Sequence, residues 1–371
     1  MNSSIMISRK EFLSTVGKTV IGGSLISGFG FPWIRGSAQK KKLGVALVGL
    51  GSYAGGQLAP GLQRTTHCEL RGVVTGTPAK IPRWQKQYSI PDRNVYNYEN
   101  MHKVANNDDI DVLYIVTPPA LHAPYAVKAA QAGKHVWCEK PMAMNAAECE
   151  SIIAACEKNG VTLTIGYRMQ HEPNTRTIMK FAEQKPYGDF NEIVSGAGYR
   201  GAHSQSSWRT KADLGGGALY DMGVYPINGI RYASGMEPVA VRGRQWSERK
   251  EMYAEVDEFT EFEMRFSNGL IAKGETAFGK STNYLRVDCE DGWYKLQPMQ
   301  SYSGVRGETS DGRQLRADPN DQQARQMDND AKAILENNPV YVPGEEGLRD
   351  IRIVNAIQES SEKGREWVSL V

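Results

Sequence analysis

A short apolar run that leads straight into a glycine-rich turn is the feature that most restricts the fold of this chain. Residues 43–48 are nearly all apolar, and the turn Gly49-Leu50-Gly51-Ser52-Tyr53-Ala54 follows at once. Such a run is typical of a parallel strand buried on both faces. In a GxGxxA turn the first glycine permits a tight bend, the second lets the backbone approach a pyrophosphate, and the small last residue lets a helix pack on the strand. The pattern therefore predicts a dinucleotide site formed by the six turn residues.

The segments after the turn alternate between helix and strand patterns. An amphipathic segment at 57–63 is followed by apolar strand patterns at 69–74, 112–116 and 135–138. Because parallel strands need a crossover connection between them, this alternation predicts an α/β fold with a Rossmann-type parallel sheet. An isolated GxGxxA pattern is a weak signal, and it is this context that makes it specific.

The end of the second strand indicates which dinucleotide is bound. An NAD site commonly has Asp or Glu there to bind the ribose hydroxyls, whereas this chain reads Val74-Thr75-Gly76-Thr77-Pro78-Ala79-Lys80. The hydroxyl of Thr75 or Thr77 and the cation of Lys80 suit a 2′-phosphate, so the sequence favours NADP, with NAD as the alternative. Gly76 lies in the same expected site. The other interpretation of Lys80 is a solvated lysine at a helix start.

Charge and cysteine content exclude several other classes of function. The chain has 371 residues, which suggests two domains, and its 44 basic and 42 acidic side chains leave a formal net charge of +2. This balance gives no electrostatic basis for binding nucleic acid or an anionic membrane. The five cysteines include no CxxC pair, so we expect buried free thiols, with Cys149 and Cys156 on one helix face, and no metal site. A small molecule is the expected partner.

The first 38 residues have the composition of an export signal. Arg9 and Lys10 precede an uncharged, glycine-rich apolar stretch at 19–34, and the small residues at 36–38 suit cleavage after Ala38. The Arg-Lys pair resembles the twin-arginine signal with its second arginine replaced, and that route suits a periplasmic protein that folds around a cofactor before export. The apolar stretch is short and contains glycines and a proline, so a membrane anchor is the less favoured alternative.

Several motifs follow one another along the rest of the chain. They are Thr117-Pro118-Pro119-Ala120-Leu121-His122, Cys138-Glu139-Lys140-Pro141-Met142-Ala143, Gly166-Tyr167-Arg168, Trp208-Arg209, Leu214-Gly215-Gly216-Gly217, Asp221-Met222-Gly223-Val224-Tyr225 and Pro343-Gly344-Glu345-Glu346-Gly347. In these motifs the chain resembles the family that includes glucose-fructose oxidoreductase, inositol dehydrogenase and the rhizopine catabolism proteins (Gfo/Idh/MocA). Within that family it resembles the glucose-fructose oxidoreductase branch most, and the resemblance extends from Leu43 to the C-terminus.

The resemblance implies a domain organisation. It implies a Rossmann domain at 43–165 and a C-terminal α/β domain at 166–371 with a large, open, mainly antiparallel sheet. In relatives another subunit commonly covers that sheet, so a homo-oligomer, either a dimer or a tetramer, is expected. The residues themselves predict strands at 255–266 and 270–278 joined by an Asn268-Gly269 hairpin, and helices at 321–336 and 346–363.

The resemblance also implies a catalytic group of Lys140, Asp221 and Tyr225. The lysine of the EKP motif is catalytic in the family, and Lys140 follows a strand at the sheet edge where ligands bind in this architecture. Asp221 and Tyr225 are four residues apart on an expected helix, so both project from one face. Many relatives have histidine in place of Tyr225. Tyr225 would act as the base if a cation such as Lys140 favours its phenolate, and otherwise Asp221 would take the proton.

The remaining expected contacts divide between cofactor and substrate. The resemblance implies cofactor contacts from the loop after the fourth strand, from Glu139 and Lys140, from Tyr98 near the adenine, and from three residues on the nicotinamide side. By residue these are Thr117, Pro118, Pro119, Leu121, His122, Glu139, Lys140, Tyr98, Arg168, Trp208 and Arg209. The expected substrate contacts are Lys140, Arg168, Asp221, Tyr225 and Tyr302. His203 lies in a polar segment and is expected to be an ordinary exposed histidine.

These features together predict an NADP-dependent oxidoreductase that transfers a hydride between a sugar, or a related polyol, and the nicotinamide. One alternative is a glycoside-cleaving enzyme of the same fold that uses transient oxidation and elimination. Another is a non-catalytic sensor of nucleotide or sugar, which would have no need of a proton acceptor. After cleavage at Ala38 only four residues would precede Leu43, so we expect the nucleotide to be held less firmly than by the long N-terminal arm of glucose-fructose oxidoreductase.

Overall fold

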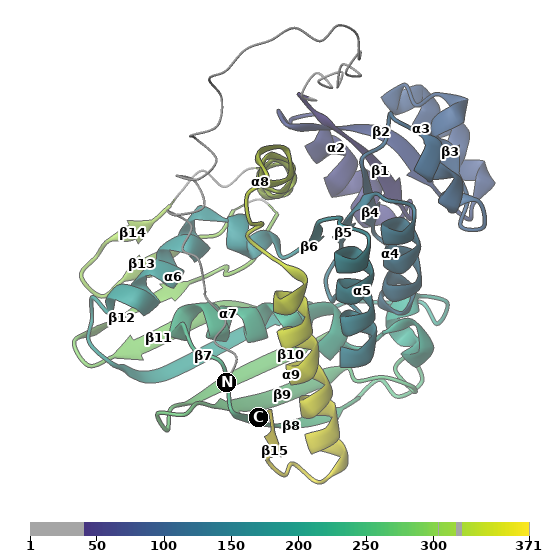
Figure 1. Cartoon of the computed structure of the whole chain (residues 1–371). Helices are drawn as coiled ribbons and strands as arrows, with labels where there is room; N and C mark the ends of the chain where they lie inside the picture. The colour runs from purple at the N-terminus through teal and green to yellow at the C-terminus, as the bar shows by residue number, and fades with distance from the viewer. Residues whose placement is uncertain (1–40, 303, 317–320, 371) are drawn as a thin grey trace, which may run out of the picture. The chain divides into compact units, whose positions relative to one another are not determined.

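The structure is a computed structural model, and it describes residues 41–302, 304–316 and 321–370 (Figure 1). The expected export signal at 1–38 lies outside these residues. Among the described residues no helix is both long enough and apolar enough to cross a membrane.

A six-stranded parallel sheet forms the N-terminal part of the described chain. Its strands are β1 (Leu43–Val48), β2 (Cys68–Val74), β3 (Val95–Tyr96), β4 (Val112–Ile115), β5 (His135–Cys138) and β6 (Leu163–Ile165). They are ordered β3-β2-β1-β4-β5-β6, which is the strand order of a dinucleotide-binding Rossmann sheet. Every residue of β1 is buried, as its apolar sequence predicts for a strand covered on both faces.

Helices cover both faces of this sheet. They are η1 (Ala54–Leu58), α2 (Ala59–Leu62), η2 (Pro78–Lys80), α3 (Ile81–Tyr88), η3 (Asp92–Asn94), η4 (Met101–Asn106), η5 (Pro119–Leu121), α4 (His122–Gln131) and α5 (Ala146–Lys158). On one face Leu58 and Trp84 share a core with Leu47 of β1. On the other face α4 and α5 pack against a core that contains Ala46 and Leu113. Apolar residues on both sides of each strand therefore find partners.

A larger, mixed sheet forms the second part. Its strands are β7 (Phe190–Gly198), β8 (Ala240–Trp246), β9 (Phe259–Arg265), β10 (Ile271–Ala277), β11 (Thr282–Cys289), β12 (Gly292–Leu296), β13 (Gly307–Thr309), β14 (Gln314–Leu315) and β15 (Val368–Ser369). The order is β14-β13-β12-β11-β7-β10-β9-β8-β15, and all neighbours are antiparallel except β7 and β10. This confirms the expected α/β fold with a Rossmann sheet and a large, mainly antiparallel second sheet.

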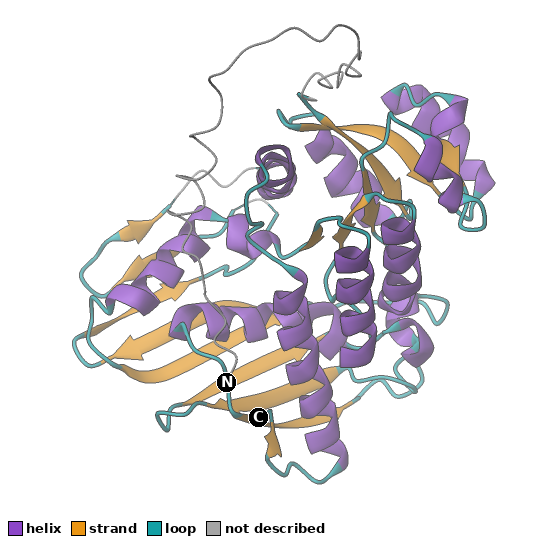
Figure 2. Ribbon diagram, in the orientation of Figure 1, coloured by secondary structure: helices purple, strands orange, loops and turns teal. Residues whose placement is uncertain are grey.

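The helices of the second part are η6 (Arg168–His171), α6 (Pro173–Gln184), η7 (Trp208–Thr210), η8 (Ala212–Leu214), η9 (Leu219–Gly223), α7 (Val224–Ser234), α8 (Gln322–Glu336) and α9 (Gly344–Glu362). The longer ones except α8 gather on one face of the larger sheet. In Figures 1 and 2, α6, α7 and α9 lie over the same side of the sheet. The opposite face carries exposed side chains, among them Arg244, Glu261, Ile271 and Lys273.

Helix α8 comes from the C-terminal part of the chain but packs on the first sheet, beside α2 (Figure 1). Its Met327 and Ala331 share a core with Leu47 of β1. The carboxylate of Asp328 accepts backbone hydrogen bonds from Thr66 and His67 at 2.8 and 2.7 Å. The residues after 166 therefore do not form a spatially separate unit, because the apolar stripe of α8 completes a face of the Rossmann sheet.

Helix α9 packs against both sheets, and two glycines permit its close approach. It contacts α5 and β6 on one side and β8 on the other. A Cβ atom on Gly347 would lie 2.7 Å from the sulfur of Met142, and one on Gly344 would lie 2.6 Å from Leu163. The Pro343–Gly347 motif thus places small residues where the helix backbone meets the Rossmann core.

Most of the local predictions are confirmed. The expected hairpin is the turn between β9 and β10, where Gly269 has φ +90° and its N–H donates to the carbonyl oxygen of Phe266. The two C-terminal helices form as α8 and α9 within two residues of their expected starts. All five cysteines are buried free thiols, and Cys149 and Cys156 lie on the buried side of α5 with Ile152.

Candidate active site

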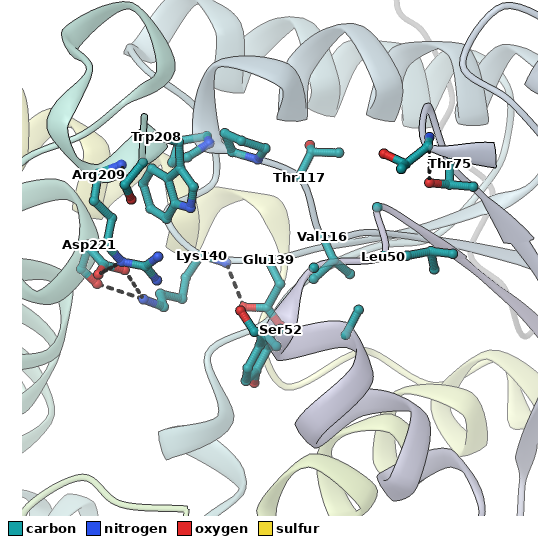
Figure 3. A pocket seen from close by; sticks show the side chains of 18 of the residues that line it. Leu50, Ser52, Thr75, Val116, Thr117, Glu139, Lys140, Trp208, Arg209 and Asp221 are labelled. Atoms are coloured by element: carbon teal, nitrogen blue, oxygen red, sulfur yellow. Dashed lines mark hydrogen bonds and ion pairs between the residues drawn. The ribbon is translucent and has the colours of Figure 1, made fainter. Parts of the chain in front are cut away.

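A cavity of about 550 Å³ lies at the carboxyl edge of the Rossmann sheet, where β1, β2, β4 and β5 end (Figure 3). It is lined by Gly49, Leu50, Gly51, Ser52, Tyr53, Ala54, Thr75, Thr77, Lys80, Tyr98, Val116, Thr117, Pro118, Pro119, Glu139, Lys140, Ser204, Ser207, Trp208, Arg209, Asp221, Tyr225 and Tyr302. In parallel α/β sheets ligands bind at this edge, where the strand order reverses. Here β1 lies between β2 and β4, which is that reversal point.

The glycine-rich turn forms the floor of the cavity. Gly49 has φ +101°, and a Cβ atom there would lie 2.7 Å from the carbonyl oxygen of Val116, so glycine is required on both counts. A Cβ atom on Gly51 would meet nothing within 4 Å, which leaves its backbone open to the cavity. The following turn, η1, is π-helical instead of the expected α-helix. Open backbone N–H groups at the start of a helix suit the phosphates of a dinucleotide.

Thr75, Thr77, Lys80 and Tyr98 form one end of the cavity. The hydroxyl of buried Thr75 accepts a hydrogen bond from the backbone N–H of Thr77 at 3.1 Å. The Nζ of Lys80 donates to the carbonyl oxygen of Leu50 at 2.8 Å, so its charge is directed back across the cavity to the glycine-rich turn. The ring of Tyr98 stacks on Tyr125 and closes against Gly76. Two threonine hydroxyls and one lysine cation therefore lie together at this end of the cavity.

Glu139 and Lys140 follow directly after β5. The hydroxyl of Tyr114 donates to Oε1 of Glu139 at 2.6 Å, and the backbone N–H of Lys140 donates to Oε2 at 3.3 Å. Burial raises the pKa of the Glu139 carboxyl, while Tyr114 and Lys140 act in the opposite direction. The Glu139 carboxylate also packs on the Cα of Gly166, where a Cβ atom would lie 2.7 Å from Oε1. This packing holds Lys140 at the sheet edge, with its side chain in the cavity.

The opposite end of the cavity from Thr75 holds a cluster of charged side chains (Figure 3). The Nζ of Lys140 donates to the carbonyl oxygen of Asp221 at 2.7 Å and lies 3.7 Å from its Oδ1. Arg209 donates from Nε to Oδ2 of Asp221 at 2.7 Å. Burial alone would raise the pKa of Asp221, but Lys140 and Arg209 outweigh it and hold that pKa below its usual value. Asp221 is therefore an ionised carboxylate that fixes both cations.

Tyr225 lies one helical turn beyond Asp221 and is held between two cations. Lys140 Nζ is 4.7 Å from its ring centroid, and Nη2 of Arg168 is 3.5 Å from its hydroxyl oxygen. Burial raises the pKa of the Tyr225 phenol, but Arg168 and Lys140 outweigh burial, so the net pKa is below the usual value for tyrosine. The turn that carries Asp221, η9, is π-helical, and such turns are frequent at functional sites.

Trp208 and Arg209 come from the short η7 turn of the second part of the chain. The guanidinium of Arg209 lies 4.5 Å from the Trp208 ring centroid, and both side chains line the cavity. A guanidinium can donate hydrogen bonds to hydroxyl groups, while an indole can cover an apolar ring face. Tyr302 also lines the cavity, with its ring 5.9 Å from that of Tyr53.

Four of the expected site residues do not line this cavity. Arg168 is buried behind Tyr225 and Tyr302, where it donates to Gln300, Gln322 and the carbonyl oxygen of Ser301. His122 is buried, with its ring nitrogens near the carbonyl oxygens of Thr117 and Pro141. Gly76 and Leu121 lie beside lining residues without lining the cavity themselves. The structure therefore places these four residues behind or beside the lining residues, and their contact with ligand stays a prediction.

Three lining residues were absent from the expected set. They are Val116, Ser204 and Ser207. Val116 directly follows β4 at the same sheet edge, so its position in the sequence was a usable signal. The two serines lie in a polar loop with no motif, and only the folded arrangement of that loop brings them to the cavity.

The expectation for His203 was wrong. It is half-buried, and its Nε2 lies 2.8 Å from the hydroxyl of Tyr199, while its Nδ1 lies 3.0 Å from that of Tyr253. The ring of Phe278 lies nearly perpendicular to the imidazole, with a centroid distance of 4.6 Å. The polar local sequence suggested exposure, but Tyr253 and Phe278, which are distant in the sequence, cover part of the ring.

No group of His, Cys, Asp and Glu side chains within the described ranges is arranged to hold a metal ion.

Comparisons with known protein families identify both parts of the chain. The family model described as "Oxidoreductase family, NAD-binding Rossmann fold" (GFO_IDH_MocA) matches residues 43–167. The model described as "GFO/IDH/MocA C-terminal domain" matches residues 175–295.

Individual relatives cover nearly the whole described chain. The structure of an aldose-aldose oxidoreductase from Caulobacter crescentus, complexed with glycerol, is 35% identical, with a TM-score of 0.83 over 89% of this chain and 100% of that one. The D-xylose 1-dehydrogenase (NADP+) of Haloarcula marismortui is 28% identical over 89% of this chain and 94% of the relative. A scyllo-inositol dehydrogenase from Lactobacillus casei, 19% identical with a TM-score of 0.73, shares the fold over 89% of this chain and 99% of its own.

Proposed function

The chain belongs to the GFO/IDH/MocA oxidoreductase family, and on that basis we propose that it transfers a hydride between a sugar and NADP. The observation that carries this proposal is the convergence of Lys140 and Asp221 at the end of the cavity opposite Thr75, with the ring of Tyr225 beside Lys140. A dinucleotide whose ribose phosphate lies at Thr75 and Lys80, and whose pyrophosphate lies on the glycine-rich turn, would bring its nicotinamide to this group.

The three residues suit the removal of a proton from a hydroxyl group. A bound nicotinamide would supply the hydride acceptor, and the protein must take the hydroxyl proton. Asp221 is a weak base, because Lys140 and Arg209 lower its pKa. The phenol of Tyr225 loses its proton more readily than an ordinary tyrosine, since Arg168 and Lys140 stabilise the phenolate. We assign proton acceptance to Tyr225 and the positioning of Lys140 to Asp221.

The sugar would be bound between Trp208, Arg209 and Tyr302. The indole of Trp208 offers an apolar face for the C–H groups of a pyranose ring, and Arg209 offers donors to its hydroxyls. Ser204 and Ser207 also line the cavity, and Ser207 directly precedes Trp208 in the sequence. Relatives named for xylose and for aldoses support an aldose as the substrate class.

A panel of aldoses and polyols, assayed with NADP at the absorbance band of reduced nicotinamide, tests this function. We expect reduction of NADP with at least one aldose, and native mass spectrometry of the purified protein should identify any nucleotide carried through purification. A nucleotide-binding protein that oxidises no member of the panel would contradict the proposal and favour a sensor. Cleavage of a glycoside without net reduction of nucleotide would favour the elimination mechanism instead.

The preference for NADP is assigned to Lys80. We expect Lys80→Ala to weaken NADP binding by roughly 10- to 100-fold, the value of a charge-assisted hydrogen bond, with little effect on NAD. Titration of the protein's intrinsic fluorescence with each nucleotide measures this difference. The matched control is Lys86→Ala on α3, an exposed lysine outside the cavity lining. Equal losses for the two nucleotides would remove Lys80 from 2′-phosphate recognition.

We also propose that the protein is exported and oligomeric. The export proposal rests on the signal-like composition of 1–38, and N-terminal sequencing of the mature protein from its native host should begin after Ala38.

The proposal of a dimer or tetramer rests on the helix-free face of the larger sheet, where Trp246 and Phe259 stack at 5.2 Å and Ile271 is 39% exposed. Sedimentation equilibrium that gives a monomer mass would contradict the second proposal.

A further inference from the structure

A continuous chain of hydrogen bonds leads from Asp221 in the candidate active site, through the loop that follows β7, to Tyr253. Tyr199 donates to Oδ2 of Asp221 at 3.4 Å, and its oxygen lies 2.8 Å from Nε2 of His203. Nδ1 of His203 lies 3.0 Å from the hydroxyl of Tyr253. Three side chains from two segments, the loop after β7 and the segment around Tyr253, thus extend the hydrogen bonding of Asp221 outward.

Three aromatic rings hold the imidazole of His203 in place. Tyr199, Tyr253 and Phe278 pack against it with ring-centroid distances of 5.7, 6.0 and 4.6 Å, all near edge-on. Arg249 fixes the surrounding backbone by donating to the carbonyl oxygens of Gly201 and Phe278, both at 2.7 Å. Arg249 is itself held by the buried carboxylate of Glu258 at 2.5 Å. This packing keeps both ring nitrogens aligned with their tyrosine partners.

The chain of bonds has two orientations, which depend on the tautomer of His203. With the proton on Nε2, every donor points toward Asp221: Tyr253 to Nδ1, Nε2 to Tyr199, and Tyr199 to Asp221. With the proton on Nδ1, Tyr199 donates to Nε2 and Nδ1 donates to Tyr253, so every donor points outward. A neutral imidazole, which has one donor and one acceptor nitrogen, allows both orientations.

The charges that face His203 favour that neutral form. Burial is the largest effect and lowers the pKa of His203. The charges of Arg209 and Arg249 lower this pKa further, whereas the charge of Asp221 raises it. Tyr199 and Tyr253 face the ring as neutral phenols, because burial raises the pKa of each. The neutral ring therefore has one nitrogen that accepts a hydrogen bond and one that donates, as the relay requires.

The outer end of the chain is Tyr253, whose buried side chain, 2% exposed, forms part of the wall of a second cavity of about 680 Å³. Tyr253 lines it together with Ser247, Lys250 and Glu255, and it is separate from the cavity that holds Asp221. The side chain of Asp221 is only 9% exposed before any ligand is bound. Nucleotide and sugar in the first cavity would cover Asp221 and Tyr225, so a proton released during turnover needs another way out.

We propose that Tyr199, His203 and Tyr253 form a relay that carries the proton of the reaction between Asp221 and the solvent in the second cavity. The inference rests on the proposed sugar oxidation and deepens it. The three side chains act on the substrate through Asp221, so they are positioning and proton-carrying residues and do not touch the reacting carbon.

The proton balance of the relay is simple. A bound nicotinamide would accept the hydride from the C–H bond of the sugar, and the hydroxyl proton passes to the phenolate of Tyr225. Lys140 lies beside both groups, so it gives a proton to the carboxylate of Asp221 and takes the proton of Tyr225 in return. Asp221 holds that proton only transiently, because its pKa is low. Asp221 passes its proton to Tyr199, Tyr199 to Nε2 of His203, and Nδ1 of His203 to Tyr253 and water. One proton leaves per hydride, and rotation of the hydroxyls with a change of tautomer restores the starting state.

Stopped-flow kinetics with a pH indicator tests the relay in the full-length protein. Reduced nicotinamide and released protons are followed together after mixing nucleotide-loaded protein with the best aldose of the panel. In the wild type we expect both signals to rise at the same rate. In His203→Gln, whose amide keeps polar contacts but cannot exchange tautomers, we expect proton release to lag by about 10-fold, below the 10²- to 10⁴-fold scale of losing the base itself. The KM for sugar should stay unchanged.

Two further variants separate proton transfer from structure. Adding imidazole to His203→Ala should restore synchronous proton release, which a merely structural role would not allow. His102→Gln, at an exposed histidine on η4, is the matched control and should behave as wild type. Synchronous release in His203→Gln, or no effect of imidazole on a delayed His203→Ala, would overturn the relay. A wild-type protein that reduces no NADP with any aldose would instead overturn the proposed function.

Discussion

At the scale of single residues, the competition between burial and charge decides which group takes the proton. Asp221 and Tyr225 are both buried, and burial alone would raise the pKa of each. Cations outweigh burial at both positions, but the consequences differ. A lower pKa makes a carboxylate a poorer base, whereas it brings a phenol closer to the pH range in which it can act. The position of Lys140 beside both groups therefore assigns them different roles.

Loss of any member of this group should affect chemistry more than nucleotide binding. We expect Lys140→Met, Asp221→Asn and Tyr225→Phe each to lower kcat by about 10²- to 10⁴-fold. Because the three side chains act as a unit, the double variants should lose much less than the product of the single losses. Steady-state kinetics measures kcat, and fluorescence titration with NADP provides the control. Unchanged turnover and pH dependence in Tyr225→Phe would transfer the base role to Asp221.

The pH dependence of turnover should report the cations around Tyr225. If the phenolate accepts the proton, oxidation increases with pH as Tyr225 ionises, and its lowered pKa moves this limb to lower pH. Removing a cation must raise that pKa, so Arg168→Gln should shift the limb of kcat to higher pH. Arg168→Lys retains the charge and should shift it less. A limb at the same pH in both variants would exclude Tyr225 as the titrating group.

At the scale of elements, α8 shows how a helix distant in the sequence completes the Rossmann domain. Its apolar residues enter the core of the first sheet, and Asp328 satisfies two backbone N–H groups in the loop before β2. A buried or half-buried donor that loses its partner destabilises the fold more than a surface ion pair does. The attachment of α8 therefore depends on Asp328 more than on the exposed charges of the same helix.

Two substitutions on α8 should separate these contributions. We expect Asp328→Ala to lower the free energy of unfolding by about 1–3 kcal/mol, because two N–H groups lose their acceptor. Glu336→Ala removes an exposed ion pair with Lys332, whose atoms are 3.9 Å apart, and should cost less than about 0.5 kcal/mol. Urea denaturation followed by circular dichroism gives both values. Equal losses of unfolding free energy would show that the hydrogen bonds from Thr66 and His67 to Asp328 stabilise the fold no more than the exposed ion pair does.

At the scale of the whole described chain, α8 and α9 couple the two sheets. Helix α9 contacts α5 and β6 of the Rossmann part and β8 of the larger sheet. The cavity is likewise shared, since Lys140 comes from the first part and Asp221 from the second. Residues that must act together thus lie on two supports held by common helices.

Because of this coupling we expect one cooperative unfolding transition. Trp137 on β5 and Trp293 on β12 report on the two sheets, so single-tryptophan variants that retain one or the other should give coincident denaturation curves. Saturating NADP should move both curves together, by about 2.7 kcal/mol at a ligand concentration of 100 times Kd. Two separated transitions would contradict the coupling of the sheets by α8 and α9.

The sequence by itself determined the features that depend on neighbouring residues. The buried strand before Gly49, the positive φ at that glycine, the hairpin at Gly269 and the place of Lys140 after β5 all follow from local patterns of apolar residues and turn residues. The order of the motifs along the chain indicated the protein family, and the family in turn implied the fold. These properties are encoded within short windows, so they can be predicted without knowledge of the tertiary structure.

Only the tertiary structure decided which distant residues meet. Lys140 and Asp221 are 81 positions apart, Tyr253 lies 50 positions after His203, and Arg168 is buried behind Tyr225 although the sequence suggested direct contact with ligand. The polar surroundings of His203 in the sequence indicated exposure, yet Tyr199, Tyr253 and Phe278 cover part of its ring. Burial, charge and hydrogen bonding at these positions arise from packing between segments, and packing is a property of the folded chain that no local pattern contains.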